Sequence, residues 1–298
     1  MKTKPPLIRL VIATLVLCFS ARAAFAESTA TDSPPPGSIS AVELWPEGKM
    51  PGAGAKEAET NLPAKGDGVR RITNISRPTL TLFSAPTAAD PAPAMIICPG
   101  GGYNYVVYDK EGTEIAKWLN SQGIQALVLK YRAPHNREGA LQDLQRAVSL
   151  ARSRAAAWKI DPKKLGVIGF SAGGNLAAKC SAPASDRSYA PLDEIDQQSC
   201  RPDFALLIYP AYLERDGQVA PDLNLNANIP PTLIVHTEDD KALVGGSKLY
   251  HAALDARNIP NEFRLYPTGG HGYGLRSDKD VSVWPNAALE WLHKIGVR

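Results

Sequence analysis

The residues with the clearest capacity for chemistry surround a single serine. The apolar run Leu165–Phe170 leads into the stretch Gly169–Gly173, which has the spacing G-x-S-x-G. At a strand-to-helix corner of this kind the serine hydroxyl stands clear of the sheet, because the flanking glycines have no Cβ to collide with neighbouring backbone. A helix beginning at Ala172 would aim free backbone N–H groups at the same corner. The pattern predicts Ser171 as a nucleophile and Ala172 as one donor of an oxyanion hole.

Five residues with two free positions are a weak signal, since a tight glycine turn gives the same pattern by chance. A nucleophilic serine also needs a second oxyanion donor, and the glycine run at 100–102 offers candidates. This run follows the apolar stretch Ala94–Cys98, where a hydrolase would place its second donor. Glycines let a ligand approach the backbone closely. We therefore expect Gly101 and Gly102 to be oxyanion donors rather than part of a flexible turn.

A base and an orienting acid complete the requirements of serine nucleophilic catalysis. His271 lies on a glycine-rich loop after the last apolar run, and the acids of Glu238–Asp240 follow the run Thr232–His236. An acid at a strand end is either a helix N-cap or the group that orients the histidine. The chain order Ser171, Asp240, His271 is that of α/β hydrolases.

Short apolar runs alternate with amphipathic segments from residue 70 onward, which is typical of β-α-β units. Continuous apolar runs indicate a mostly parallel sheet with helices on both faces. The expected strands are 94–98, 125–129, 165–170, 204–209, 232–236 and 262–266, and the expected helices are 111–122, 141–158, 172–179, 242–256 and 285–294. In such a sheet, ligands bind beyond the carboxyl ends of the strands. The connections 181–201 and 210–231 are short and lack long apolar helices, so we expect no large lid.

The first 66 residues are expected to precede the catalytic domain. Residues 1–26 combine a basic start, an apolar stretch and an A-x-A ending, which predicts a cleavable signal peptide and a secreted or periplasmic protein. Residues 27–66 are rich in Pro, Gly and Ala, which predicts a linker and an N-terminal arm lying on the domain. Residues 67–298 are expected to form a single catalytic domain, and its first strands, 70–73 and 79–83, are expected to be antiparallel at the sheet edge.

Removing the signal removes four basic residues and leaves 29 Lys and Arg against 30 Asp and Glu. This balance offers no basic footprint for nucleic acid, and no membrane contact is expected after signal removal.

Cys98 is expected to be buried, and the spacing of Cys180 and Cys200 is as consistent with free thiols as with a disulfide. Metal-ligand motifs are absent from the sequence, so neither a metal nor a cofactor is implied. The sequence sets no oligomeric state.

From about Ile72 to Leu292 the chain resembles the α/β-hydrolase superfamily. Specifically, it is similar to the branch of bacterial secreted esterases related to acetyl-xylan and feruloyl esterases and to dienelactone hydrolases. The stretches that carry the resemblance are CPGGGY at 98–103, KEG at 110–112, LKYR at 129–132, DP at 161–162, GFSAGG at 169–174, RPDF at 201–204, YP at 209–210, EDD at 238–240 and GGHG at 269–272. The resemblance implies an α/β-hydrolase fold.

The same resemblance implies roles for individual residues. Ser171 is the implied nucleophile, His271 the base, and one of Asp239 and Asp240 the acid. Asp240 is the better match, because in the family the acid stands two residues before the next apolar helix start. The implied oxyanion donors are Gly101, Gly102 and Ala172. The chain departs from the family pattern at Pro99, Lys241 and Gly245.

The implied function is a serine carboxylesterase that deacetylates xylan-type polysaccharides through an acyl-enzyme. Tyr103 and Tyr273, together with Tyr105 and Tyr108, are expected to crowd the rim of a shallow site. Tyr103 and Tyr273 are the candidate substrate contacts, and a structural role is the expectation for at least two of the four. One alternative is a peptidase of the same fold, which would usually carry an extra screening domain. Another is a glycan-binding protein or glycoside hydrolase in which the serine centre is not the active one. A glycoside hydrolase needs two facing carboxylates, whereas the acids here fall mostly on predicted helix surfaces.

Overall fold

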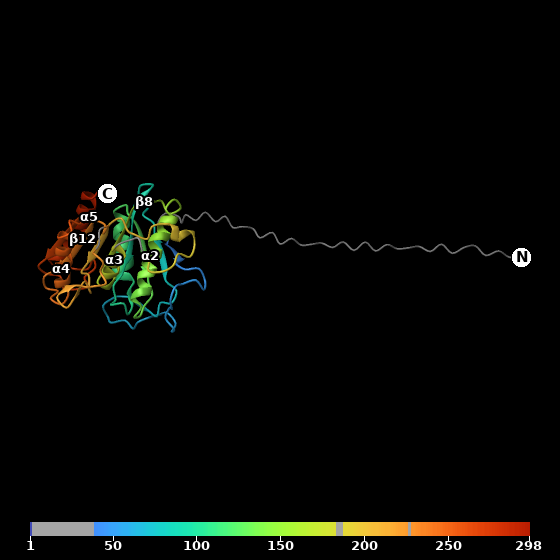
Figure 1. Ribbon diagram of the computed structural model, residues 1–298, viewed down its shortest axis with the longest axis horizontal. Coiled ribbons are helices and arrows are strands. Elements are labelled where there is room, and N and C mark those ends of the chain that lie inside the picture. The colour runs from blue at the N-terminus through green and yellow to red at the C-terminus, as the bar shows by residue number, and fades with distance from the viewer. Residues whose placement is uncertain (2–38, 183–186, 226–227) are drawn as a thin grey trace. The chain divides into compact units, whose positions relative to one another are not determined.

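An eight-stranded sheet forms the centre of the molecule in the computed structural model (Figure 1). The structure describes residues 1, 39–182, 187–225 and 228–298. The strands, in spatial order, are β1 (Ile39–Glu43), β4 (Thr79–Phe83), β7 (Gln125–Lys130), β5 (Ala92–Cys98), β8 (Ile160–Phe170), β9 (Ala205–Ile208), β12 (Thr232–Thr237) and β13 (Asn261–Tyr266). The six strands β7, β5, β8, β9, β12 and β13 run parallel to one another, whereas β4 is antiparallel to both β1 and β7. The predicted mostly parallel sheet is confirmed.

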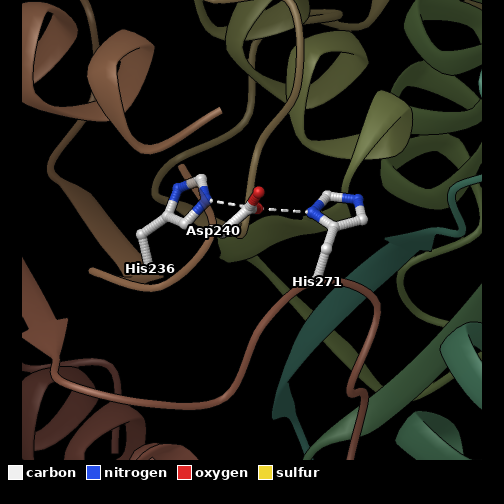
Figure 2. Close-up of side chains that lie close together, drawn as sticks. All are labelled: His236, Asp240 and His271. Atoms are coloured by element: carbon white, nitrogen blue, oxygen red, sulfur yellow. Dashed lines mark hydrogen bonds and ion pairs between the residues drawn. The ribbon is translucent and has the colours of Figure 1, made fainter. Parts of the chain in front are cut away.

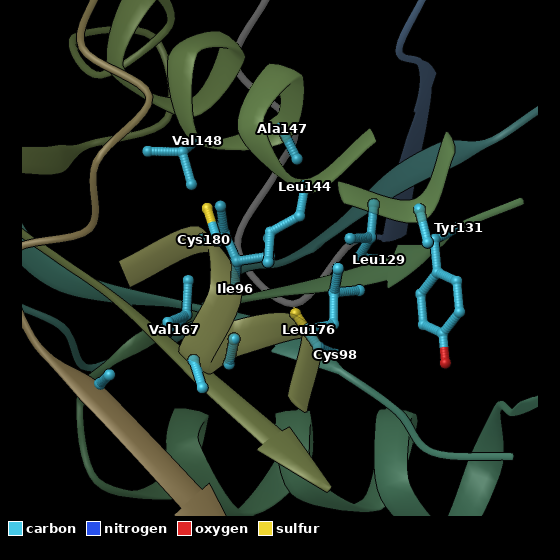
Figure 3. Packing of buried hydrophobic residues seen from close by; sticks show 14 of the residues in the cluster. Ile96, Cys98, Leu129, Tyr131, Leu144, Ala147, Val148, Val167, Leu176 and Cys180 are labelled. Atoms are coloured by element: carbon cyan, nitrogen blue, oxygen red, sulfur yellow. The ribbon is translucent and has the colours of Figure 1, made fainter. Parts of the chain in front are cut away.

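The central strands contain long apolar runs because both faces of the sheet are covered. Side chains on a strand alternate between its faces, and in β5 Ile96 and Cys98 contribute to one hydrophobic core while Met95 and Ile97 contribute to the other. Figure 3 shows the first of these cores. A strand that buries both faces carries no polar alternation, which explains the continuous apolar runs in the sequence.

Among the residues that the structure describes, five α-helices cover the sheet, as predicted. They are α1 (Glu114–Ser121), α2 (Arg137–Ser153), α3 (Ala172–Ser181), α4 (Val244–Asp255) and α5 (Trp284–Lys294). Helices α2, α3 and α4 contribute to one core, and α1 and α5 contribute to the other. In Figure 1, α2 and α3 lie side by side in front of the sheet. Leu144 of α2 is fully buried there, and its truncation to alanine should cost about 2–5 kcal/mol.

The remaining elements are short. The helix expected at 111–122 begins with a π-helical turn, η1 (Asp109–Thr113), and the 3₁₀-helices are η2 (Glu194–Gln197) and η3 (Asp280–Val283). The strands β10 (Glu214–Arg215) and β11 (Gln218–Val219) form a hairpin. Across the ranges that the structure describes, none of the helices is long and apolar enough to cross a membrane.

One expectation for the sheet edge is wrong. Strand β3 (Arg71–Thr73) does not pair with β4 but joins β2 (Thr60–Asn61) and β6 (Val106–Val107) in a separate three-stranded sheet. On its outer side β4 pairs instead with β1, which comes from the predicted arm. The arm therefore supplies the edge strand of the central sheet, so the sheet begins well before residue 67. Residues 2–26 of the predicted signal segment and the beginning of the linker lie outside the described residues.

The three cysteines from Cys98 onward are buried and free. The Sγ of Cys180 lies 3.6 Å from the carbonyl oxygen of Cys200, to which it donates a weak hydrogen bond. Cys180 and Cys200 are therefore free thiols and do not form a disulfide. Burial raises the pKa of the Cys180 thiol well above its ordinary value, so it is an unreactive core side chain.

Candidate active site

Ser171 occupies a strained corner between β8 and α3. Its φ and ψ are 52° and −116°, a conformation that L-residues rarely adopt. The corner is tight: a Cβ on Gly169 would lie 2.1 Å from the Gly173 carbonyl oxygen, and one on Gly173 would lie 1.9 Å from the carbonyl oxygen of Cys98. Both distances are far below van der Waals contact. Glycine is therefore required at both positions, as the sequence pattern predicts.

His271 and Asp240 meet Ser171 at the carboxyl edge of the sheet. His271 follows β13 and Asp240 follows the neighbouring parallel strand β12, so the two loops emerge side by side. The Ser171 Oγ lies 2.8 Å from Nε2 of His271, and Nδ1 of His271 lies 2.7 Å from Oδ2 of Asp240. Because an ionised carboxylate only accepts hydrogen bonds, Nδ1 carries the proton. Nε2 is then free to accept the serine hydroxyl hydrogen.

Asp239, the other candidate acid, has a different set of contacts. Its carboxylate oxygens accept the backbone N–H groups of Gly269 and Gly270 at 3.1 and 2.8 Å. These bonds, foremost that from Gly270, lower the pKa of Asp239 to about 2. Asp239 thus fastens the backbone of the histidine loop, while Asp240 contacts the imidazole itself.

The glycine loop after β5 presents backbone donors beside Ser171. Gly101 and Gly102 have φ values of +130° and +65°, and the carbonyl of Gly101 accepts the N–H groups of Asn104 and Tyr105. These bonds close the loop on itself. Within the described ranges, the N–H groups of Gly101, Gly102 and Ala172 have no hydrogen-bond acceptor. Gly101 and Gly102 line the same cavity as Ser171, and Ala172 follows Ser171 directly. All three residues predicted for an oxyanion hole therefore have an unpaired backbone donor near the serine.

A cavity of about 310 Å³ opens at this edge. Its volume is at the lower end of the range for small-molecule sites. About a third of the His271 side chain is exposed, so the reacting atoms are accessible to solvent. The cavity is lined by Val69, Arg71, Gly101, Gly102, Asn104, Tyr105, Val107, Lys110, Glu111, Ser171, His271 and Gly272.

Glu111 is a buried acid in this cavity wall for which the residue patterns gave no role. Its Oε2 accepts the N–H of Gly100 at 2.7 Å, and its Oε1 accepts the hydroxyl of Tyr209 at 2.9 Å. The Tyr209 hydroxyl in turn accepts the N–H of Gly274 at 3.0 Å. Burial raises the pKa of Glu111, and the bonds from Gly100 and Tyr209 partly oppose that rise. Only the KEG stretch of the family resemblance marked this position in the sequence.

Comparison with known proteins identifies relatives of this chain. A family model described as BD-FAE matches residues 80–202. A solved structure, the acetyl ester-xyloside bifunctional hydrolase from Caldicellulosiruptor lactoaceticus, is 30% identical, covers 88% of this chain and 98% of its own, and has a TM-score of 0.69. The chain belongs to the BD-FAE family of α/β hydrolases.

Two further relatives support this membership. The acetylxylan esterase of Xylanibacter ruminicola is 31% identical over 210 residues, which are 61% of this chain and 41% of that protein. The chain thus spans less than half the length of this curated relative. MGS-M1, an α/β hydrolase from a deep-sea metagenome library of the Medee basin, is 27% identical, covers 82% of this chain and 98% of its own, and has a TM-score of 0.61.

In this BD-FAE family member the expectation that Tyr103 and Tyr273 crowd the rim is wrong. Tyr103 is 2% exposed and its hydroxyl donates to Oδ1 of Asn175 at 2.8 Å. A φ of 61° at Tyr103 is the local feature that accompanies this inward placement. Tyr273 is 5% exposed and packs edge-on against Tyr209, with ring centroids 4.3 Å apart. Of the four expected tyrosines, Tyr105 lines the cavity.

Tyr212 is the aromatic residue near the glycine loop that the sequence did not single out. It is 38% exposed and has a φ of 55°. The side chain of Asn175 donates to its carbonyl at 3.1 Å, and the guanidinium of Arg137 lies 4.3 Å from its ring centroid. Its hydroxyl lies 3.7 Å from the position that a Cβ on Gly102 would take. An exposed tyrosine therefore lies beside the predicted oxyanion loop.

The histidines and the acid at the strand ends also form a group with metal-binding side chains. The nearest donor atoms of His236, Asp240 and His271 all lie within 4.8 Å of one another. Figure 2 shows Asp240 between the two histidines. Each imidazole nitrogen that faces Asp240 is already 2.7–2.9 Å from the same oxygen, Oδ2. At these distances a proton joins each pair of atoms, so the group is a hydrogen-bonded chain.

Proposed function

We propose that the protein is a serine carboxylesterase that removes short acyl groups, foremost acetyl groups of xylan-type polysaccharides. The observation that carries the proposal is the hydrogen-bonded chain from Ser171 through His271 to Asp240, beside a cavity with unsatisfied backbone donors. A nucleophile, a base, an orienting acid and an oxyanion site are the parts that acyl transfer requires.

In the first half of the proposed reaction, Ser171 Oγ attacks the ester carbonyl carbon while its proton passes to Nε2 of His271. Asp240 holds the imidazole in the tautomer that can accept this proton and stabilises the imidazolium that forms. The C–O bond to the alcohol then breaks, and the proton on Nε2 passes to the departing alcohol oxygen. The product is an acyl ester of Ser171.

The negative charge that develops on the carbonyl oxygen needs fixed donors. The N–H groups of Gly101, Gly102 and Ala172 are available for this role because no other described acceptor uses them. They are fixed before the substrate arrives, so the reaction requires no reorganisation to stabilise the charge. Losing one such donor should lower kcat by about 10²- to 10³-fold.

Water completes the cycle. It attacks the acyl carbon while His271 accepts its proton, and collapse of the tetrahedral species releases the carboxylic acid and returns the proton to Ser171 Oγ. The exposed face of His271 is consistent with water reaching Nε2. The overall reaction consumes one ester bond and one water and releases an alcohol and an acid.

The relatives support the acetyl and xylan parts of the proposal. One is named an acetylxylan esterase, and the solved structure that shares 30% identity is named an acetyl ester-xyloside hydrolase. A cavity of about 310 Å³ suits a small acyl group. Export through the predicted signal at 1–26 would place the enzyme where plant polysaccharides are found.

The test is hydrolysis of p-nitrophenyl acetate, p-nitrophenyl octanoate and acetylated xylan by the mature chain, residues 27–298. We expect acetate to be cleaved faster than octanoate, acetate to be released from xylan, and Ser171→Ala to be inactive on all three. A Ser171→Ala protein with wild-type rates would refute the proposal. Turnover of p-nitrophenyl xyloside by both proteins, without any esterase activity, would favour the glycoside hydrolase alternative.

A further inference from the structure

A second histidine contacts the proposed catalytic acid from the opposite side to His271. His236 is the penultimate residue of β12 and is fully buried. Its Nε2 lies 2.9 Å from Oδ2 of Asp240, and its Nδ1 lies 2.8 Å from the Oγ of Ser247 in α4. The same oxygen, Oδ2, is 2.7 Å from Nδ1 of His271. Figure 2 shows the carboxylate held between the two imidazoles.

The contacts of His236 determine which of its nitrogens carries the proton. Burial lowers the pKa of His236 despite the opposing effect of Asp240, so the imidazole is neutral near pH 7 and has a single N–H. The carboxylate of Asp240 can only accept, so the hydrogen is on Nε2. Nδ1 must then accept the hydroxyl hydrogen of Ser247. The serine on α4 therefore holds His236 in the tautomer that donates to Asp240.

The carboxylate of Asp240 has few other restraints. Within the part of the chain that the structure describes, its side chain forms hydrogen bonds only with His236 and His271. A carboxylate held from one side alone can rotate about its terminal torsion, which is broad and soft. A second donor on the same oxygen fixes the direction from which His271 must approach.

We propose that His236 is a positioning residue for the reaction, which holds Asp240 ionised and aligned with His271 through a direct hydrogen bond. This inference rests on the proposed role of Ser171, His271 and Asp240. His236 does not touch the substrate cavity, since it is fully buried and absent from the cavity wall. Its effect on the chemistry is transmitted through Asp240.

The hydrogen bond from His236 also has a consequence for protonation. While His271 is neutral, the negative charge of Asp240 is stabilised by the His236 N–H. Once His271 takes up a proton, the imidazolium neutralises that charge and the bond from His236 contributes less. His236 therefore favours the neutral form of His271, which is the form that can accept the serine proton. Without His236, we expect activity to be lost at a higher pH on the acid side.

Other titratable groups lie near the hydrogen-bonded residues His236, Asp240 and His271, and their effects on the pH profile must be distinguished from the effect of His236. Tyr209 packs edge-on against His271, with ring centroids 5.0 Å apart. The buried Glu111 also lies near His271, whose charge lowers the pKa of Glu111 and so opposes the effect of burial. Burial raises the pKa of Tyr273, and the charges of Asp240 and Asp239 raise it further. Each of these groups remains in a His236 variant, so a change in pH profile can be assigned to the lost donor.

The experiment compares His236→Leu, which removes the donor, with His236→Gln, whose amide N–H can reach the same oxygen. We expect His236→Leu to lower kcat for p-nitrophenyl acetate about 10- to 100-fold with little change in KM. We also expect the acid side of its profile of kcat/KM against pH to move upward by about half a pH unit or more. His236→Gln should restore both to within about threefold and about 0.2 pH units of wild type.

A matched control is available in His251. This histidine also has an acid four residues later, with Nε2 3.4 Å from Asp255, and also contacts a polar side chain, Asn261. His251→Gln should leave the pH profile unchanged. Ser171→Ala is measured beside it. If Ser171→Ala is inactive while His236→Leu matches wild type in rate and profile, the role of His236 is refuted and the proposed function stands. If Ser171→Ala keeps its activity, the proposed function itself fails.

A second measurement does not depend on the Leu variant folding. Nitrogen-15 NMR of the histidine-labelled wild-type protein at pH 7 should show His236 as a neutral imidazole protonated at Nε2. Protonation at Nδ1 would overturn the inference, because Nε2 could then not donate to Asp240. Equal losses in His236→Gln and His236→Leu, with both proteins folded, would overturn it as well.

Discussion

The carboxylate of Glu111 accepts the hydroxyl hydrogen of Tyr209 at 2.9 Å, and this contact joins the two loops of the candidate site. The other oxygen of Glu111 fixes the N–H of Gly100 in the glycine loop, and the Tyr209 hydroxyl fixes the N–H of Gly274 in the histidine loop. The predicted oxyanion donors and the predicted base are thus held by one buried network. Networks of this kind stabilise only when every member is satisfied.

Removing the acid of this network should harm both stability and rate. Glu111→Ala leaves the donors of Gly100 and Tyr209 without their acceptor, at about 1–3 kcal/mol for each one that stays unpaired. The glycine loop loses its anchor, so kcat for p-nitrophenyl acetate should fall about 10- to 100-fold. Urea denaturation and steady-state kinetics measure the two effects. Tyr209→Phe, which keeps the Gly100 bond, should lose less activity, and an Ala variant with wild-type kcat would contradict this role.

Glu111 also predicts a dependence of stability on pH. Burial raises its pKa in the folded protein, so above about pH 4.5 the folded state retains a proton that the unfolded chain has released. The folded state then binds more protons, and this group makes the free energy of unfolding fall as pH rises from the unfolded to the folded pKa. Between the ordinary glutamate pKa and the raised pKa of the folded state, the slope should be shallower in Glu111→Ala than in wild type. Identical slopes would show that Glu111 does not titrate differently on folding.

Asp239 and Asp240 should respond very differently to the same substitution. Asp240→Asn replaces the group that fixes the His271 tautomer, and a loss of about 10⁴-fold in kcat is expected by comparison with other triads. Asp239→Asn weakens only the bonds to Gly269 and Gly270, so a loss of less than about tenfold is expected. Kinetics on p-nitrophenyl acetate decide the matter. The opposite ranking would make Asp239 the catalytic acid.

The lowered pKa of Asp239 predicts a loss of stability at acid pH, the opposite direction to the effect of Glu111. Because its pKa is about 2 in the folded protein, its contribution to stability is present above the ordinary aspartate pKa and is lost as pH falls toward 2. The carboxylate is near the surface, so solvent screening limits this contribution to well under about 1 kcal/mol. Asp239→Asn should flatten the acid part of the stability curve slightly, and an unchanged curve between pH 4 and 2 would contradict the assignment.

Much of this site was predictable because its signals are local. Ser171 stands between glycines that a Cβ would force into backbone, and the apolar runs around it are strands buried on both faces. Since parallel strands end at one edge, residues after β5, β8, β12 and β13 had to converge there. The choice of Asp240 over Asp239 came from family resemblance and not from spacing.

What the sequence could not give depends on contacts between distant segments. Tyr103 directs its hydroxyl inward to Asn175, which is 72 residues away in the sequence. Its ring is therefore buried, although its position after the glycine run suggested the rim of the cavity. Glu111 and His236 look like ordinary helix and strand residues until Tyr209 and Asp240 are placed beside them. Strand β3 pairs with β2 and β6 rather than with β4, whose outer edge pairs with β1, and neither β1 nor β2 was expected as a strand.

The glycine loop offers a final prediction in which the effect of a clash can be separated from that of backbone strain. A Cβ on Gly101 would lie 2.0 Å from the carbonyl oxygen of Tyr105, a backbone atom that cannot move aside without opening the loop. Gly101→Ala should therefore displace the N–H donors and lower kcat by about 10²- to 10³-fold.

Two other glycines calibrate that experiment. Gly102 and Gly48 have φ values of +65° and +68°, and a Cβ on Gly102 would meet only side-chain atoms at 3.4 Å or more, whereas one on Gly48 would meet nothing within 4 Å. Alanine at either position should cost about 1 kcal/mol of stability from the left-handed backbone alone. Gly48→Ala should keep wild-type kcat, and Gly102→Ala should lose less activity than Gly101→Ala. If Gly101→Ala is as active as Gly48→Ala, the closed form of the loop is not required, and the oxyanion site must be sought elsewhere along the cavity wall.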